Sequence, residues 1–453
     1  MSVKDSERHA MPPEASSAGA DTNPYESPRA PEPTTWARGE LGIVWTLWLT
    51  YGAFYFCRTN LSAAVPGLGM SPAEGGMGLT SGEIGWILAS LKIAYGLGQM
   101  LNGQLAERFS PRLLLALGMF GSAALNVLFG FSTGFYFLLF VWAANGYCQS
   151  LGWPPTIRVA GNWIPVSRRG KAIGIIGTGY QITLGVTYFV ASQAAEYLGW
   201  RGALYVPAIL LVATGLFTLI VLRDHPAEAG ASHDAEQHRL SLPPRGTWIE
   251  NVVLTLANPA LWLFGLSLGL LNACRYGFLD WGISHLMSVQ NIGVGKAGLT
   301  YIVLAIGAVL GSYLAGWATD RFFGSRRAPV ICMLLVALGV LTLLYESISQ
   351  VSAYGTIALL VAIGFCIFGP QVLLVGTAPA DLARRGTSAA AVGFVNFLGY
   401  MGASAGDVVT GYFKTPEHGG WQTAIYIWAG WAFAAALFAG LLWNQGARRE
   451  EHA

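Results

Sequence analysis

Long apolar stretches alternate with short polar connections along most of the chain. Each stretch holds about 20 mostly apolar residues, the length that a helix needs to cross the hydrocarbon core of a bilayer. Because lipid offers the backbone no hydrogen-bond partners, the pattern predicts membrane-spanning helices, whose backbone groups bond internally. Twelve such helices are expected, near residues 41–63, 83–105, 112–131, 134–157, 171–195, 201–222, 258–288, 296–318, 328–347, 353–376, 387–412 and 420–443.

The polar segments divide these helices into two sets of six. The longest interruption, residues 223–257, is expected to be a cytoplasmic linker between one bundle at 41–222 and another at 258–445. Residues 1–40 are rich in Pro, Ser, Ala and acidic side chains and lack the apolar core of a signal peptide. They therefore predict a disordered cytoplasmic N-terminal tail. A short cytoplasmic tail is expected at 446–453.

The composition excludes several classes of protein. Only 11% of the 453 residues are charged, whereas soluble proteins carry roughly a quarter, so a soluble enzyme is not expected. The five cysteines lie in apolar stretches and are odd in number, which does not fit a secreted disulfide scaffold. A formal net charge of +2 gives no broad basic surface for nucleic acid. The lipid bilayer is the expected surrounding, and an all-α polytopic membrane protein is the expected fold class.

The basic residues orient the predicted helices. Of the 26 Lys and Arg, 20 lie in the tails and in the even-numbered connections. Only Arg201, Lys296 and Lys414 lie in the odd-numbered connections. Because basic residues concentrate on the cytoplasmic side, both termini are expected in the cytoplasm, with the chain in the inner (cytoplasmic) membrane.

The two sets of helices contain a repeated motif. NGQLAERFSPR follows the second helix and AGWATDRFFGSRR follows the eighth, and both contain Gly-x-x-x-acid-Arg. The two copies lie 213 residues apart, and a second similarity, SRRGKAIG with ARRGTSAA, has an offset of 216. A nearly constant offset indicates a duplicated six-helix unit. The motif residues are Gly103, Glu107 and Arg108, and Gly316, Asp320 and Arg321.

These loop sequences resemble the motif between helices 2 and 3, and 8 and 9, of the major facilitator superfamily. In physical terms, the glycine would permit close helix approach, and the acid and arginines would form a cytoplasmic charge relay. The alternative is a basic loop that only orients the chain, which explains the arginines but not the doubled pattern. The resemblance implies two pseudo-symmetric six-helix bundles.

Two arginines lie inside predicted spans. Arg58 in the first helix and Arg275 in the seventh are 217 residues apart, which matches the repeat. A charge inside the bilayer is costly, at least about 2.5–3.5 kcal/mol, and is therefore usually functional. As symmetry partners, two forked guanidinium groups suit a dianionic phosphate. The alternative is a structural ion pair of an arginine with Asp280 or Asp407.

The roles of three further charged residues in the predicted helices are less clearly indicated by the sequence. Lys92 in the second helix could line a cavity, but we favour a side chain that snorkels towards an interface. Asp407 in the eleventh helix remains open between a proton-coupling carboxylate, a substrate contact and a satisfied polar residue. Asp280 is a candidate partner for a neighbouring helix.

Several blocks make the resemblance more specific. NGYCQSLGWPPTIRVAGNWIPVSRRG in helix 4 and its loop, RYGFLDW in helix 7, and GFCIFGPQVLL with RRGTSAAAVGFVNFLGYMG in helices 10 and 11 resemble the organophosphate:phosphate antiporter family of that superfamily. The similarity runs from about residue 45 to 443. The family includes glycerol-3-phosphate and hexose-phosphate transporters.

The resemblance implies roles residue by residue. Arg58 and Arg275 match the two arginines that hold the substrate phosphate. Tyr51, Tyr55 and Tyr400 match tyrosines of the central cavity, and Asp280 matches a buried acid of helix 7. Trp153, Pro154 and Pro155 are expected to be structural, since the prolines bend the end of helix 4.

The chain also departs from the family pattern around these arginines. Thr59 follows Arg58 where glycerol-3-phosphate transporters have lysine, and Gln99 stands at a helix 2 lysine. Tyr180, with Gln181 beside it, replaces a cavity histidine of helix 5. Ala305 stands where the family has a glutamate in helix 8, and Phe368 stands where it has a tyrosine in helix 10. These changes leave the organic part of the substrate open.

The sequence therefore predicts a secondary transporter that exchanges an organophosphate for inorganic phosphate and functions as a monomer. A sugar-phosphate sensor of the same fold, or a proton symporter of another anion that uses Asp407 or Asp280, are the alternatives. No phosphate-cradling Gly-x-x-x-x-Gly-Lys-[Ser/Thr] string occurs. Neither catalysis nor a cofactor or metal is expected.

Overall fold

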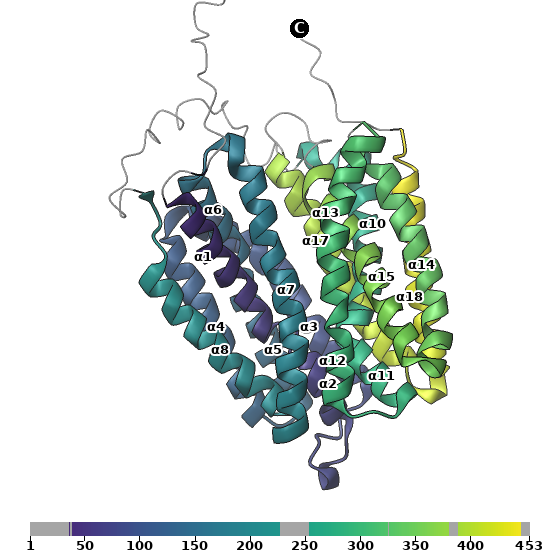
Figure 1. The fold of residues 1–453 in the computed structure, drawn as a ribbon. Coiled ribbons are helices and arrows are strands. Elements are labelled where there is room, and N and C mark those ends of the chain that lie inside the picture. Colours follow the sequence, from purple (N-terminus) through teal and green to yellow (C-terminus); the bar gives the residue numbers. More distant parts are fainter. Residues whose placement is uncertain (1–35, 37–38, 227–252, 325, 380–387, 445–453) are drawn as a thin grey trace, which may run out of the picture.

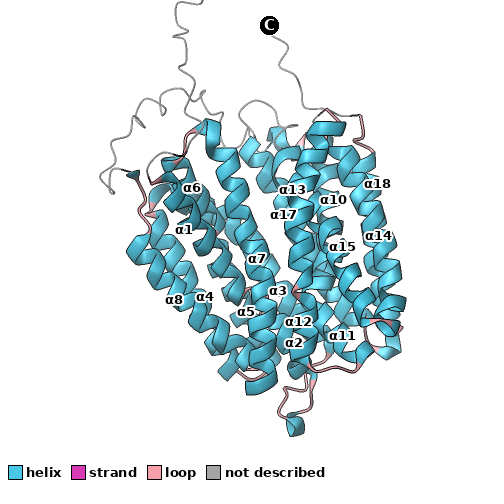
Figure 2. Ribbon diagram, in the orientation of Figure 1, coloured by secondary structure: helices cyan, strands magenta, loops and turns pink. Residues whose placement is uncertain are grey.

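The structure is a computed structural model that describes residues 36, 39–226, 253–324, 326–379 and 388–444. The described residues form helices joined by short connections, and none of them lies in a strand (Figure 2). The predicted N-terminal tail up to residue 35, most of the predicted linker and the C-terminal tail lie outside the described residues.

The first half of the chain supplies the helices of one bundle, purple to teal in Figure 1. Their ends lie close to the predicted ranges. They are α1 Glu40–Ala53, the short 3₁₀ turn η1 Phe54–Cys57, α2 Leu61–Gly69, α3 Ser81–Arg108, α4 Pro111–Phe131, α5 Phe135–Ser150, α6 Trp153–Trp163, α7 Val166–Leu198 and α8 Gly202–Val221.

The second half forms the other bundle, green to yellow in Figure 1. Short 3₁₀ turns, η2 Pro72–Glu74 and η7 Pro416–His418, lie in one connection of each bundle. The helices of the second bundle are α10 Pro259–Tyr276, the π-helical turn η5 Gly277–Trp281, α11 Gly282–Gln290, α12 Val294–Tyr301, α13 Val303–Phe322, α14 Arg327–Val351, α15 Ala353–Val372, the π-helical turn η6 Leu373–Thr377, α17 Ser388–Phe413 and α18 Gly420–Gly440.

Capping residues in the connections fix where several helices begin. At the start of α3, the Thr80 side chain accepts a hydrogen bond from the Glu83 backbone N–H, and the Glu83 carboxylate accepts one from the Thr80 N–H at 2.8 Å. This reciprocal pair satisfies donors that a helix start leaves open. Ser110 caps α4 and Asn258 caps α10, each followed by a proline at the first turn.

Eight segments of the described residues are long and apolar enough by themselves to cross a bilayer. Three of the other four predicted spans are interrupted helices: η1 separates α1 from α2, Leu151 and Gly152 separate α5 from α6, and η5 separates α10 from α11. The break before α6 falls where Pro154 and Pro155 enter the first turn, as expected. The fourth, α17, is continuous but rich in small and polar side chains.

The two bundles meet where α3 packs on α17, where α7 packs on α12 and α13, and where α2 packs on α11 and η5. Glycines allow the closest approaches. A Cβ added to Gly85 of α3 would lie 2.7 Å from the backbone oxygen of Asp407, and one added to Gly298 of α12 would lie 2.0 Å from Oγ of Ser192 in α7. These contacts lie in the half of each helix that is farther from the predicted cytoplasmic connections.

Candidate substrate-binding site

Arg58 lies at the end of the 3₁₀ turn that interrupts the first span, and only 6% of the residue is exposed. Its Nε donates a hydrogen bond to Oε1 of Gln149 at 3.0 Å, and its Nη2 donates to the Gln149 backbone oxygen at 3.4 Å. Gln149, in the last turn of α5, donates in turn from Nε2 to the Phe54 backbone oxygen and to Oγ of Ser122. The guanidinium is therefore held by a side chain that is itself fixed.

Arg275 lies at the end of α10, directly before the π-helical turn η5, and is 2% exposed. Its Cζ lies 4.8 Å from the centre of the Tyr276 ring and 4.9 Å from that of Phe368. Its Nε and Nη2 have no hydrogen-bond partner among the described residues. Buried donors normally have acceptors, so this guanidinium has donors available for an anion.

A row of aromatic rings connects the two arginines. The guanidinium of Arg58 lies 4.7 Å from the Tyr55 ring, which stacks on Tyr180 at 5.1 Å between ring centres. Tyr180 in turn lies 6.4 Å from Phe368, the ring beside Arg275. Residues that are 217 positions apart in the sequence thus share one buried aromatic cluster between the two bundles.

The other predicted aromatic residues border the same cluster. Tyr51 packs against Trp153 at 4.7 Å and meets the edge of Tyr180. Tyr400 of α17 packs against Tyr95 of α3 at 4.6 Å, and Arg58 lies 4.4 Å from the Tyr95 ring.

Gln181 has a different neighbour. Its Nε2 donates a hydrogen bond to Oγ of Ser312 in α13 at 2.6 Å, which joins α7 of one bundle to the other bundle. Gln181 is buried, and its Oε1 has no hydrogen-bond partner among the described residues.

The expectation that Lys92 snorkels towards an interface is wrong. Lys92 is 3% exposed and forms ion pairs with both Asp280 of η5 and Asp407 of α17. Its Nζ also lies 4.7 Å from the Tyr276 ring. Two oppositely charged partners at the bundle interface hold the ammonium inside, where a snorkelling lysine would find none.

The same contacts exclude the alternative of a structural ion pair for the arginines. Asp280 and Asp407 both pair with Lys92, and neither Arg58 nor Arg275 has a carboxylate within ion-pair distance among the described residues. Asp280 is thus a partner for a neighbouring helix, as its position suggested. The aromatic cluster carries two guanidinium charges that those residues do not neutralise.

The repeated loop motif is only partly engaged. Asp320 forms an ion pair with Arg327 at 2.9 Å, which links the end of α13 to the start of α14. Arg108 and Arg321 are exposed, and the Glu107 side chain lies outside the described residues. A Cβ added to Gly103 or Gly316 would meet no atom of the described residues within 4 Å, so close helix approach at these glycines stays a prediction.

Three residues of the cluster were not among the sequence candidates. Gln149 stood in the GWPP block only as part of a motif, Tyr95 lies one helical turn after Lys92, and Tyr276 directly follows Arg275. The i, i+3 spacing of Lys92 and Tyr95 was an available signal, because such residues share one face of a helix.

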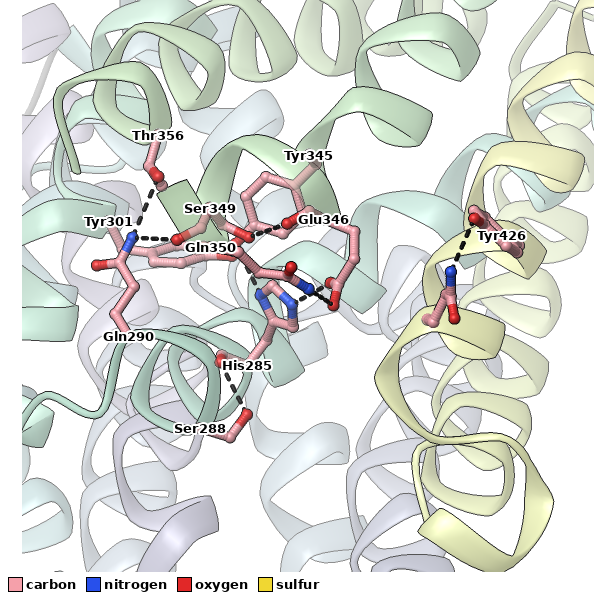
Figure 3. A network of polar contacts seen from close by, with 11 residues as sticks. His285, Ser288, Gln290, Tyr301, Tyr345, Glu346, Ser349, Gln350, Thr356 and Tyr426 are labelled. Atoms are coloured by element: carbon pink, nitrogen blue, oxygen red, sulfur yellow. Dashed lines mark hydrogen bonds and ion pairs between the residues drawn. The ribbon is translucent and has the colours of Figure 1, made fainter. Parts of the chain in front are cut away.

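A second polar network lies away from this cluster, within the second bundle (Figure 3). The His285 ring nitrogens contact Oε2 of Glu346 at 2.7 Å and the hydroxyl of Tyr345 at 3.2 Å. The Tyr345 hydroxyl also contacts that of Tyr301 at 3.1 Å. The network ties α11 and α12 to α14, and its groups satisfy one another, so it braces the bundle.

The fold matches known transporters. The family profile of the Major Facilitator Superfamily matches residues 47–407. A mutant form of the nucleoside transporter NupG superposes with a TM-score of 0.70 at 16% identity, over 90% of this chain and all of that one. A bacterial homologue of the lysosomal transporter Spinster, in an inward-facing and unoccupied conformation, gives 0.68 at 16% identity, over 90% of this chain and 96% of that one. At these identities the structures show the fold alone.

Relatives found by sequence similarity say more about the kind of protein than the solved structures do. The chain is 29% identical to the glycerol-3-phosphate transporter of Bacillus subtilis, over 89% of this chain and 92% of that one. It is 28% identical to the membrane sensor protein UhpC of Escherichia coli, over 88% and 89%, and 27% identical to a probable hexose phosphate transport protein of Chlamydia trachomatis, over 90% and 93%. The relatives match the resemblance of the sequence to the organophosphate:phosphate antiporter family, and the chain belongs to the major facilitator superfamily of multi-pass membrane transporters.

Proposed function

We propose that the protein is a secondary antiporter that exchanges an organophosphate, such as a sugar phosphate or glycerol 3-phosphate, for inorganic phosphate. One observation carries this proposal. Arg58 and Arg275, at corresponding positions of the two repeats, border one buried aromatic cluster and have no carboxylate partner among the described residues. Two buried cations that share a site favour an anion between them.

The chemistry of the cluster suits a phosphate group. A guanidinium is always charged and presents forked donors that match two oxygens of a phosphate. The tyrosine hydroxyls of Tyr51, Tyr55, Tyr180 and Tyr400 add neutral donors around it. Burial strengthens each of these interactions, because fewer water molecules screen the charges. Inorganic phosphate and an organophosphate share the group that the arginines would bind, which is the requirement for exchange at one site.

The two bundles provide the moving parts of the proposed mechanism. Residues 41–222 and 258–445 would rock about the central site, joined by the linker at 223–257. With both termini in the cytoplasm, as the basic residues favour, the close contacts of α3 with α17 and of α7 with α12 lie on the outer side. The conformation described would then be closed to the outside of the cytoplasmic membrane. Opposing gradients of the two anions drive the exchange, with no chemical conversion and no cofactor, in a monomer.

The relatives support the same substrate class. Their names include a glycerol-3-phosphate transporter and probable hexose phosphate transport proteins, and each match covers most of both chains. Another relative is named a membrane sensor protein, so a sensor that binds an organophosphate without transporting it is the competing function.

Exchange in reconstituted vesicles tests the proposal. The vesicles are loaded with phosphate or with buffer alone, and labelled phosphate is added outside together with glycerol 3-phosphate, glucose 6-phosphate or 3-phosphoglycerate as competitors. We expect saturable uptake that requires phosphate inside, and the strongest competitor identifies the organic group. Uptake that is equal without internal phosphate contradicts antiport.

Thermal unfolding of the same purified protein distinguishes a sensor from an antiporter. A sensor would be stabilised against thermal unfolding by an organophosphate, because a ligand that binds the folded state raises the melting temperature, yet it would show no exchange. If none of these anions stabilises the protein and none is taken up, the assignment of phosphate binding to the arginines is overturned.

A further inference from the structure

Lys92, Asp280 and Asp407 form a buried group of three charges where the two bundles meet. Lys92 comes from α3 of the first bundle, Asp280 from η5 and Asp407 from α17 of the second. The three residues are 3%, 3% and 0% exposed. Moving an ion from water into such a site costs several kcal/mol, so the sum of the charges matters here.

The group is not balanced when all three side chains are ionised. One ammonium faces two carboxylates, which leaves one negative charge in excess. The titratable and charged groups facing Asp407 are Lys92 from α3, Asp280 from η5 and, beyond Lys92, the phenol of Tyr276 from α10. None of these supplies a second positive charge. Like charges that share a buried site disfavour ionisation of both, so an added proton is more stable in this group than elsewhere near the arginines.

The contacts indicate which carboxyl group takes the proton. Asp280 accepts a hydrogen bond from Nζ of Lys92. Asp407 lies 2.5 Å from the same Nζ and is 0% exposed, against 3% for Asp280. The more deeply buried carboxylate, which shares its ammonium with Asp280, is the less stable of the two anions, so a proton that enters the group belongs on Asp407.

One tyrosine ring connects this group to the arginines. The Tyr276 ring has the Lys92 ammonium 4.7 Å from its centre and the Arg275 guanidinium 4.8 Å from its centre. Among the described residues, this group and the aromatic cluster together contain three cations, Arg58, Arg275 and Lys92, against two carboxylates, Asp280 and Asp407. A bound phosphate dianion changes this surplus of one positive charge into a surplus of one negative charge, and one added proton makes the core neutral.

We propose that Asp407 is a proton-binding site, and that a proton occupies it when a dianionic organophosphate is bound to the arginines. The proton enters as the O–H of the Asp407 carboxyl group from the side to which the site is open, and leaves on the other side with the substrate. Each organophosphate dianion thus crosses with one proton. This inference rests on the proposed function, because it requires an anion at Arg275.

Proton uptake on substrate binding tests it. Purified protein in weakly buffered detergent solution with a pH indicator receives glucose 6-phosphate at about pH 8, where a phosphate monoester with a second pKa near 6 is dianionic. We expect about one proton taken up per bound molecule in the wild type, and none in Asp407→Asn, which is neutral at every pH. Glu417→Gln, an exposed acid on the connection after α17, is the matched control and should behave as the wild type.

Each outcome has a distinct meaning. Equal proton uptake by the wild type and Asp407→Asn, or none by a wild type that binds glucose 6-phosphate, overturns the proton site but leaves the proposed function intact. Absence of binding to the wild type, by glucose 6-phosphate, glycerol 3-phosphate and inorganic phosphate alike, overturns the proposed function instead. If Asp407→Asn does not fold, the wild-type affinity decides: it should fall by up to tenfold per pH unit as the pH rises, and a flat profile contradicts the inference.

Discussion

Gln149 holds Arg58 through a hydrogen bond of 3.0 Å between Oε1 and the guanidinium Nε, while its own amide nitrogen donates to two further groups. Arg275, at the corresponding position of the other repeat, has no such support among the described residues. The two arginines are therefore not equivalent. Arg58 is fixed to its own bundle, whereas Arg275 has free donors and rests between aromatic rings, so it has more freedom to adjust to an anion.

Gln149→Glu should weaken phosphate binding strongly. The new carboxylate would neutralise Arg58 and compete with the substrate for it. Hydrogen bonds to charged groups are worth about 1.5–3 kcal/mol, so we expect a loss of affinity of roughly tenfold to more than a hundredfold. Calorimetric titration of the purified variant with inorganic phosphate measures it. Gln422→Glu, on an exposed turn of α18, is the control. Unchanged affinity in Gln149→Glu would show that Arg58 does not bind the anion.

Lys92→Met should destabilise the fold. It leaves two buried carboxyl groups without their cation, and removal of one partner from a buried ion pair costs about 3–5 kcal/mol. The melting temperature in detergent should fall markedly. It should recover largely in the variant that also carries Asp280→Asn and Asp407→Asn, because no unpaired charge then remains. A melting temperature of Lys92→Met equal to that of the wild type would contradict the ion pairs.

A disulfide across the outer contact should stop transport. Glu196 of α7 accepts a hydrogen bond from the Gly295 backbone N–H at the start of α12, at 3.0 Å. A Cβ added to Gly295 would lie 3.3 Å from the Glu196 Cβ, just below the spacing of about 3.5–4.5 Å found in disulfides. In the double variant Glu196→Cys/Gly295→Cys, mild oxidation should therefore cross-link the bundles and abolish exchange, and a reductant should restore it.

The single variants Glu196→Cys and Gly295→Cys are the controls, since the native cysteines are present in all three proteins. Exchange at the wild-type rate by the cross-linked protein would mean that the bundles do not separate at this contact during transport.

The sequence predicted the fold well because its signals are local. A run of about 20 apolar residues has one stable form in lipid, and the repeat offset alone paired Arg58 with Arg275. The helix ends were also predictable, as at Thr80 with Glu83. The spans that contain Arg58 and Arg275 proved to be interrupted helices, and the breaks lie beside the two arginines. Pro154 and Pro155 indicated the break before α6 in the sequence. No comparable signal was recognised for the π-helical turn η5.

What could not be predicted was which helix faces which. Lys92 was expected to snorkel towards an interface, whereas its partners Asp280 and Asp407 are 188 and 315 residues farther along the chain. The role of Gln149 was likewise hidden, since its contact with Arg58 depends on how α5 crosses η1. Such contacts depend on how distant segments of the chain pack together, and local sequence patterns do not predict this packing.

Substitution of each arginine by lysine tests the central claim most directly. Lysine retains the positive charge but loses the forked donors, so Arg58→Lys and Arg275→Lys should each insert and fold normally yet exchange phosphate roughly a hundredfold more slowly. The measurement is labelled phosphate uptake into phosphate-loaded vesicles, with Arg201→Lys in an outer connection as the control. Loss of exchange in both variants, but not in the control, is the result we predict. Exchange close to the wild-type rate in both would contradict a phosphate site built on Arg58 and Arg275.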